Sequence, residues 1–149
     1  SFGVKLKHNI NKSLIKNKTL TLIDDSLVRG TTSVKIIKML YESGAKEVHL
    51  RIASPPIKYP DYYGINTPTK DELLASRLNL EEMRKFINAT TLQFLSIDGL
   101  YKSMGYEKRN TSYPQFTDHC FTGDYPIEPI DANIKNFSGE ELSFLSSKL

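Results

Sequence analysis

Apolar residues along the chain follow two periodicities, and their order predicts an α/β fold. Short apolar runs predict strands over residues 20–23, 47–53 and 91–95. In the first run only Thr21 is not apolar, and threonine is compatible with a strand. We therefore expect this strand to be buried on both faces, as in a parallel sheet.

The segment between the first two strands has helical spacing. Val34, Ile37, Leu40 and Tyr41 recur every three or four residues and predict a helix over residues 33–43. Gly44 follows, at a position where helices commonly end in a left-handed residue. Strand, helix and strand form a βαβ unit, whose crossover is expected to be right-handed.

Three further helices are predicted mainly from their capping residues. Thr69 and Glu72 have the spacing of a capping box, at the start of a helix that ends near residue 77. Asn79 is expected to cap the next helix, and Ser96 or Asp98 a third one that is closed by Gly105. The helix after Asn79 is predicted to face inward through Met83, Phe86 and Ile87.

Regular periodicity stops near residue 105, which suggests two parts. Residues 1–105 are predicted to form the α/β domain, and residues 106–149 an extended tail with a short helix from Ser138. Residues 1–9 could form an edge strand or a basic arm. The aromatic loop 57–68 could line a site or cover another surface.

Composition narrows the class of protein. With 149 residues, 39% of them hydrophobic and 25% charged, the chain is long enough for one domain with a real core. The net charge of +3 is too small and too dispersed to indicate nucleic-acid binding. No apolar run is long enough to span a membrane, and no signal peptide is visible. Cys120 is a single cysteine, so an internal disulfide is excluded. These features suit the cytoplasm.

The candidate site is the polar loop between the first strand and the first long helix. Asp24 and Asp25 offer carboxylates to hydroxyls or to a metal ion. Gly30 permits a tight turn, and Thr31 and Thr32 lie at a helix N-terminus, where a phosphate is favoured. The spacings of a P-loop and of a dinucleotide fingerprint are both missing. The residues therefore indicate a monophosphate and a diol with Mg²⁺, or simply a polar strand end that leads into a helix cap.

The run from Leu22 to Thr32 resembles the phosphoribosyl pyrophosphate signature of type I phosphoribosyltransferases. Its Asp-Asp-Ser-x-Val-Arg-Gly-Thr-Thr form resembles that of the amidophosphoribosyltransferase family. Further segments resemble the same family in the same order, at residues 44–48, 54–57, 60–65, 72–75, 95–100 and 120–126. The resemblance covers nearly the whole chain. It implies the C-terminal part of a type I phosphoribosyltransferase fold, with a parallel sheet and flanking helices.

The resemblance implies a binding role for nine consecutive residues and assigns no catalytic residue. Asp24 and Asp25 would hold the ribose hydroxyls and contribute to the Mg²⁺ environment. The 5′-phosphate would be held by Ser26, Leu27, Val28, Arg29, Gly30, Thr31 and Thr32. The family reaction displaces pyrophosphate from phosphoribosyl pyrophosphate with ammonia and gives 5-phosphoribosylamine for purine biosynthesis. Purine nucleotides inhibit the family, and its members are oligomeric.

Some family features have no counterpart in this sequence. The glutaminase domain with its nucleophilic cysteine is one, and the upstream half of the transferase domain, with the pyrophosphate contacts, is another. One branch of the family binds a 4Fe–4S cluster through four cysteines, and matching positions here hold Asp61, Thr117 and Cys120. One thiolate cannot hold such a cluster, so we expect none, with Cys120 a packed or free thiol.

Two functions remain open at this point. The chain could be part of an amidophosphoribosyltransferase that binds phosphoribosyl pyrophosphate. It could instead be a truncated, non-catalytic remnant, or a regulatory module that binds phosphoribosyl compounds or nucleotides.

Overall fold

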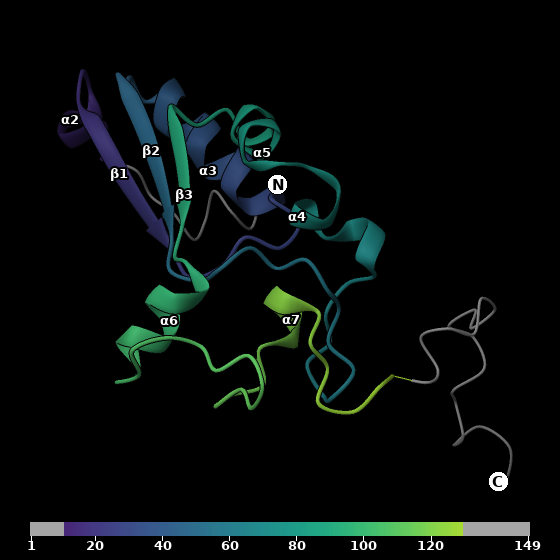
Figure 1. Cartoon of the computed structure of the whole chain (residues 1–149). Coiled ribbons are helices and arrows are strands. Elements are labelled where there is room, and N and C mark those ends of the chain that lie inside the picture. Colours follow the sequence, from purple (N-terminus) through teal and green to yellow (C-terminus); the bar gives the residue numbers. More distant parts are fainter. Residues whose placement is uncertain (1–10, 130–149) are drawn as a thin grey trace, which may run out of the picture.

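A computed structural model describes residues 11–129, in which three parallel strands form one sheet (Figure 1). The strands are β1 (Thr19–Asp24), β2 (Glu47–Ile52) and β3 (Thr91–Phe94), in the order β1-β2-β3. All three predicted strands are present, and the α/β class is confirmed. The predictions for residues 1–9 and for the helix from Ser138 lie outside the described residues.

The helices agree with most of the predicted caps. They are α2 (Lys12–Ile15), α3 (Thr31–Glu42), α4 (Leu74–Arg77), α5 (Leu80–Ile87), α6 (Ile97–Ser103) and α7 (His119–Thr122), with a 3₁₀ helix, η1 (Lys70–Glu72). Gly44 has a φ of 91°, as expected after α3. The Asn79 side chain accepts a hydrogen bond from the Glu82 amide at 3.0 Å. Ser96, rather than Asp98, caps α6 through the Gly99 amide.

The prediction of a single helix over residues 69–77 is wrong. The backbone is extended at Leu73, and this residue separates η1 from α4. Leu73 is fully buried, and the Leu74 amide donates to the Val28 carbonyl at 2.8 Å. These tertiary contacts override the local helical preference. Glu72 still accepts a hydrogen bond from the Thr69 amide, as a capping box requires.

Helices α3 and α5 lie on the same side of the sheet (Figure 1) and form the core with it. This is the arrangement expected of right-handed crossovers between strands in sequential order. Ile37, Leu50 and Ile87 are fully buried between the helices and the sheet. On α5 the buried residues are Met83 and Ile87, whereas Phe86 is 48% exposed and its predicted inward position is wrong.

The prediction that β1 is buried on both faces is also wrong. Exposure alternates along β1, and Ile23 is 73% exposed. Within residues 11–129 no helix covers the face to which Ile23 belongs. On that face polar groups pair across the strands: both the His49 ring and the Arg51 guanidinium contact the Thr91 hydroxyl, at 2.8 and 2.9 Å.

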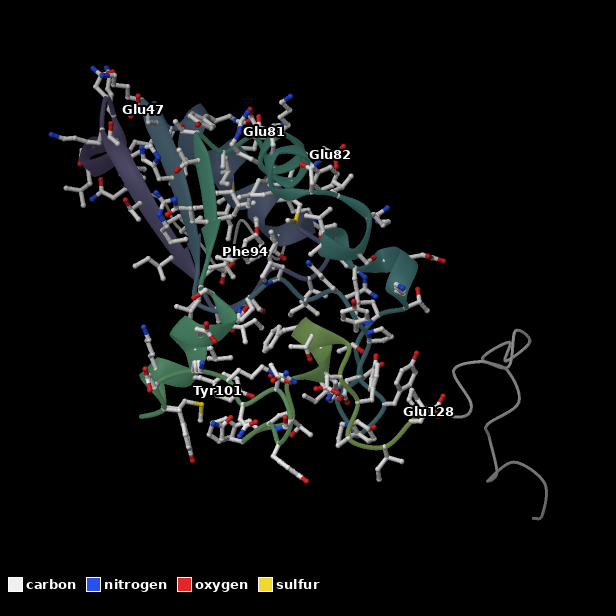
Figure 2. The ribbon with its side chains drawn as sticks, viewed as in Figure 1. Glu47, Glu81, Glu82, Phe94, Tyr101 and Glu128 are labelled. Atoms are coloured by element: carbon white, nitrogen blue, oxygen red, sulfur yellow. The ribbon has the colours of Figure 1, made fainter. Side chains whose placement is uncertain are left out.

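The tail is not uniformly extended, because residues 119–122 form α7. The amides of Lys58 and Tyr59 donate to the Cys120 carbonyl, at 2.9 and 3.1 Å, and join the aromatic loop 57–68 to α7. Figure 2 shows Tyr101 on α6, at the end of the sheet opposite Glu47. The Tyr101 hydroxyl donates to Asp118 at 2.8 Å, so residues 106–129 pack against the rest of the chain. None of the helices described here is long and apolar enough to cross a bilayer.

Candidate functional site

A cavity of about 310 Å³ lies at the carboxyl end of β1 and the N-terminus of α3. Its lining is the continuous segment of residues 24–33. The nine residues that the sequence predicts for the site all line it, and the buried Ser33 is an additional one. Ligands of open α/β sheets bind at this edge, outside the carboxyl ends of the strands.

The loop between β1 and α3 is held in position from behind. The Leu27 side chain is only 2% exposed and belongs to the core. The Val28 carbonyl accepts the 2.8 Å hydrogen bond from the Leu74 amide. Gly30 has a φ of 76°, and a Cβ atom there would lie 2.9 Å from Leu74 Cδ2. The backbone of the loop is therefore held by the core and by α4.

Backbone amides are the main binding groups that this loop offers. The N–H groups of residues 26–30 donate no hydrogen bond to any residue in the described part of the chain. The first N–H groups of α3 likewise have no partner within the helix. Together they make a cluster of donors at the positive end of a helix of 12 residues. Such a cluster favours an anion, and a phosphate has enough oxygens to accept several of these bonds.

The two carboxylates lie beside these amides. β1 ends at Asp24, and both Asp24 and Asp25 line the cavity. Asp24 Oδ1 accepts from the Asp25 amide at 3.1 Å, and Asp25 Oδ1 accepts from the Ser26 hydroxyl at 3.2 Å. Among the described residues nothing donates to the Oδ2 atom of either carboxylate, so both atoms remain available for hydroxyls or a cation.

The Arg29 side chain has a partner that sequence reasoning missed. Its Nε and Nη2 atoms donate to Glu72 Oε1 at 3.1 and 3.0 Å. The hydrogen bond from Arg29 is the main reason why the pKa of Glu72 lies below its usual value. The guanidinium is therefore engaged with η1, and the loop contributes backbone at this position. Glu72 is recognisable in the sequence as a capping residue, but nothing local connects it with Arg29.

A second polar group lies outside this cavity, where the aromatic loop meets α7. His119 Nε2 and Asp61 Oδ1 are 2.6 Å apart, and both side chains are buried. Burial opposes ionisation of Asp61, but hydrogen bonds from Ile65, His119 and Tyr63 hold its pKa below the usual value. Burial, and then the Asp61 charge, raise the pKa of the Cys120 thiol. The resemblance singles out Asp61 and Cys120 as positions that match cluster ligands, but it gives no signal for His119, which lies 58 residues from Asp61 in the chain.

Comparison with known proteins finds relatives that are named as amidophosphoribosyltransferases. The chain is 55% identical over 148 residues to an amidophosphoribosyltransferase of Rhizobium etli. It is 47% identical over 139 residues to amidophosphoribosyltransferase 1, chloroplastic, of Arabidopsis thaliana. These alignments cover 99% and 93% of this chain, but only 30% and 24% of the relatives. The chain thus spans less than a third of the length of these relatives, and no family model matches it.

Two solved structures are similar in both fold and sequence. One is a glutamine phosphoribosylpyrophosphate amidotransferase from Bacillus subtilis complexed with ADP and GMP. Its TM-score is 0.71 and its sequence is 42% identical to this chain. The match covers 85% of this chain and 29% of the Bacillus subtilis chain. The other is described as the allosteric regulatory enzyme of purine biosynthesis. Its TM-score is 0.68 and its sequence is 47% identical to this chain. The match covers 77% of this chain and 24% of the chain of that enzyme.

Proposed function

This chain belongs to the amidophosphoribosyltransferase family over the part that it spans, and from that premise we propose that its loop 24–32 binds the ribose 5-phosphate end of phosphoribosyl pyrophosphate. One observation carries the proposal. A loop held by Leu27, Val28 and Gly30 presents free amides at the start of α3, and it does so beside two carboxylates.

Each part of the loop has a role in this proposal. The amides of residues 26–30 and the hydroxyls of Ser26, Thr31 and Thr32 bind the 5′-phosphate. Asp24 and Asp25 accept hydrogen bonds from the ribose hydroxyls. The helix dipole adds about 0.3–1 kcal/mol for an anion at this position. Ser33, in the first turn of α3, is buried and also lines the cavity.

The donor set also fits Mg²⁺, which prefers oxygen ligands and is commonly held by one or two carboxylates together with substrate phosphates. The Oδ2 atoms of Asp24 and Asp25 are the protein groups that would contribute to its environment. When bound, the ion would neutralise charge on the leaving pyrophosphate. The residues of this chain would meanwhile orient the sugar and stabilise positive charge that develops on its ring.

In the whole protein we propose the family reaction, in which ammonia displaces pyrophosphate. The bond from the anomeric carbon to the pyrophosphate oxygen breaks, and a bond from that carbon to nitrogen forms, with loss of a proton. The product is 5-phosphoribosylamine. Binding by the loop does not require turnover, so it can be tested with this chain alone.

Isothermal titration calorimetry with Mg²⁺ and phosphoribosyl pyrophosphate tests the proposal. We expect saturable binding, and we expect Asp24→Asn/Asp25→Asn to abolish it. This variant makes the chain more positive, which by itself would favour an anionic ligand, so a loss of affinity identifies the carboxylates as contacts. Glu42→Gln/Glu107→Gln changes the charge equally at exposed positions and should bind normally.

Circular dichroism shows whether each protein is folded during the titrations. A folded chain that does not bind the ligand would refute the proposal, as would unchanged affinity in Asp24→Asn/Asp25→Asn. Titration with ribose 5-phosphate, in the absence of pyrophosphate, separates the two ends of the ligand. We expect it to bind, because the loop faces only the 5-phosphate end.

A regulatory role for the same loop is the second candidate function. Its support is the Bacillus subtilis relative complexed with ADP and GMP. A nucleoside monophosphate carries the same ribose 5-phosphate group, so GMP should compete with phosphoribosyl pyrophosphate for this loop. If GMP binds and phosphoribosyl pyrophosphate does not, the chain is a nucleotide-binding module. Self-association, which the family suggests, is read from light scattering in the same samples.

A further inference from the structure

Asp61, His119 and Cys120 bring three kinds of metal ligand together at one point of the fold. One ligand atom from each residue lies within 4.8 Å of the other two. The aromatic loop supplies the carboxylate, and α7 supplies the imidazole and the thiol. The cluster is separate from the cavity of loop 24–32, here called the phosphoribosyl loop, because residues 24–33 alone line that cavity.

The side chains of the cluster are well ordered by their surroundings. Asp61 Oδ2 accepts from the amides of Ile65 and Tyr63, at 2.7 and 3.0 Å. This leaves Oδ1 directed at His119. Carboxylates that bind metals are commonly oriented by such outer hydrogen bonds. The Asp61 side chain is 3% exposed and that of His119 is 5% exposed, so water has little access to the pair.

The imidazole of His119 has unused capacity. Its Nδ1 atom is buried and has no hydrogen-bond partner in residues 11–129, whereas Nε2 contacts Asp61. A buried ring nitrogen without a partner is unusual, because leaving such a group unsatisfied is costly in free energy. The ring centroids of Tyr63 and Tyr125 each lie 5.0 Å from the centroid of the imidazole, so the two rings enclose it further.

We propose that Asp61, His119 and Cys120 bind one divalent cation of the zinc type. Oxygen, nitrogen and sulfur together are the ligand set that Zn²⁺ accepts, with a water molecule at the fourth position. A single ion needs only these three ligands, and so differs from a cluster that needs four thiolates.

Binding has a stoichiometry that can be measured. The metal forms a bond with the Cys120 sulfur, and the thiol proton leaves to the buffer. No electron is transferred, because Zn²⁺ has no redox chemistry. Calorimetric titration with Zn²⁺ in two buffers of different ionisation enthalpy should therefore report release of about one proton per ion.

Cobalt provides the spectroscopic test with the whole chain. Adding Co²⁺ should give visible bands of tetrahedral cobalt and a near-ultraviolet thiolate band, and one equivalent of Zn²⁺ should remove them. Cys120→Ser should lose the thiolate band. Cys120→Ser, His119→Gln and Asp61→Asn should each weaken Zn²⁺ binding by about tenfold or more, with folding checked by circular dichroism.

Two variants serve as matched controls. His49→Gln removes another histidine that lies beside a carboxylate, that of Glu47 at 3.5 Å, and should bind zinc normally. Asp24→Asn/Asp25→Asn should also bind normally, which separates this site from the phosphoribosyl loop. Absence of cobalt bands in the folded wild-type chain would overturn the proposal. Equal zinc affinity in Cys120→Ser and wild type would do the same, since the ion would then be bound elsewhere.

Discussion

Gly30 both packs against neighbouring helices and lines the candidate site. Its left-handed φ of 76° allows the chain to turn from the loop into α3, and its missing side chain leaves room for Leu74. Phe86, although half exposed, also lies within 3.2 Å of the space that a Cβ atom would occupy. The free amides of the loop therefore depend on a glycine that contacts two other helices.

Replacing Gly30 with alanine should destabilise the chain and weaken binding of phosphoribosyl pyrophosphate. We expect a loss of about 2–4 kcal/mol in the free energy of unfolding, from left-handed strain together with overpacking against Leu74. Urea denaturation measures the loss. Gly105→Ala is the control, because Gly105 has a φ of 88° and open space around it. Equal losses in the two variants would show that the contact with Leu74 has no importance.

At the scale of elements, the sheet is covered on one face only within the described residues. Helices α3 and α5 pack on the face that carries Leu50, and polar pairs such as His49 with Thr91 occupy the other. Capping residues determine where α5 and α6 begin, because Asn79 and Ser96 accept hydrogen bonds from amides of the first turn. The burial of a strand residue, by contrast, depends on whether a helix packs on its face of the sheet.

The two faces of the sheet should respond differently to substitution. Ile23→Thr should change the free energy of unfolding by no more than about 0.5 kcal/mol, because Ile23 is exposed and threonine is also β-branched. Leu50→Ala should cost about 2–5 kcal/mol, because Leu50 is fully buried in the central strand. Chemical denaturation of both variants measures this. A large loss in Ile23→Thr would show that another segment covers this face.

At the scale of the whole molecule, a polar network joins residues 106–129 to the α/β part. Asp118 Oδ1 accepts from Arg109 Nη2 at 3.0 Å, and its Oδ2 accepts from the Tyr101 hydroxyl at 2.8 Å. Arg109 also contacts Asp124 at 2.6 Å. Burial opposes the charge on Asp118, but hydrogen bonds from Arg109, Tyr101 and Thr122 hold its pKa below the usual value.

The lowered pKa of Asp118 predicts how stability depends on pH. The unfolded chain binds a proton at Asp118 near pH 3.8, and the folded chain only at lower pH. The contribution is therefore complete above the unfolded pKa and is lost as the pH falls through the folded one. Asp118→Asn should cost about 3 kcal/mol at pH 7, because Arg109 loses a buried partner.

Urea denaturation at pH 7, 5 and 3 tests this, with Glu42→Gln as an exposed control. Other carboxylates also titrate in this range, so the informative quantity is the difference between variant and wild type. It should shrink toward pH 3. A difference that stays constant with pH would mean that the pKa of Asp118 is the same in the folded and the unfolded chain.

Local chemistry was sufficient to predict the strands, the helix that follows the first strand, and the loop between them. These depend on residues close in the chain: apolar periodicity, the caps at Asn79 and Ser96, and the left-handed Gly44. The nine predicted site residues are consecutive, and consecutive residues at a strand end remain together in any α/β arrangement. That is why the nine residues named from the resemblance all line one cavity.

Tertiary structure decided the features that depend on distant partners. The extended Leu73, the Arg29–Glu72 pair and the exposure of Ile23 follow from what packs against each residue, which no local pattern encodes. The cluster of Asp61, His119 and Cys120 forms only when α7 packs on the aromatic loop. Chain proximity is thus enough to build loop 24–32, whereas the proposed metal site requires the fold to bring two distant segments into contact.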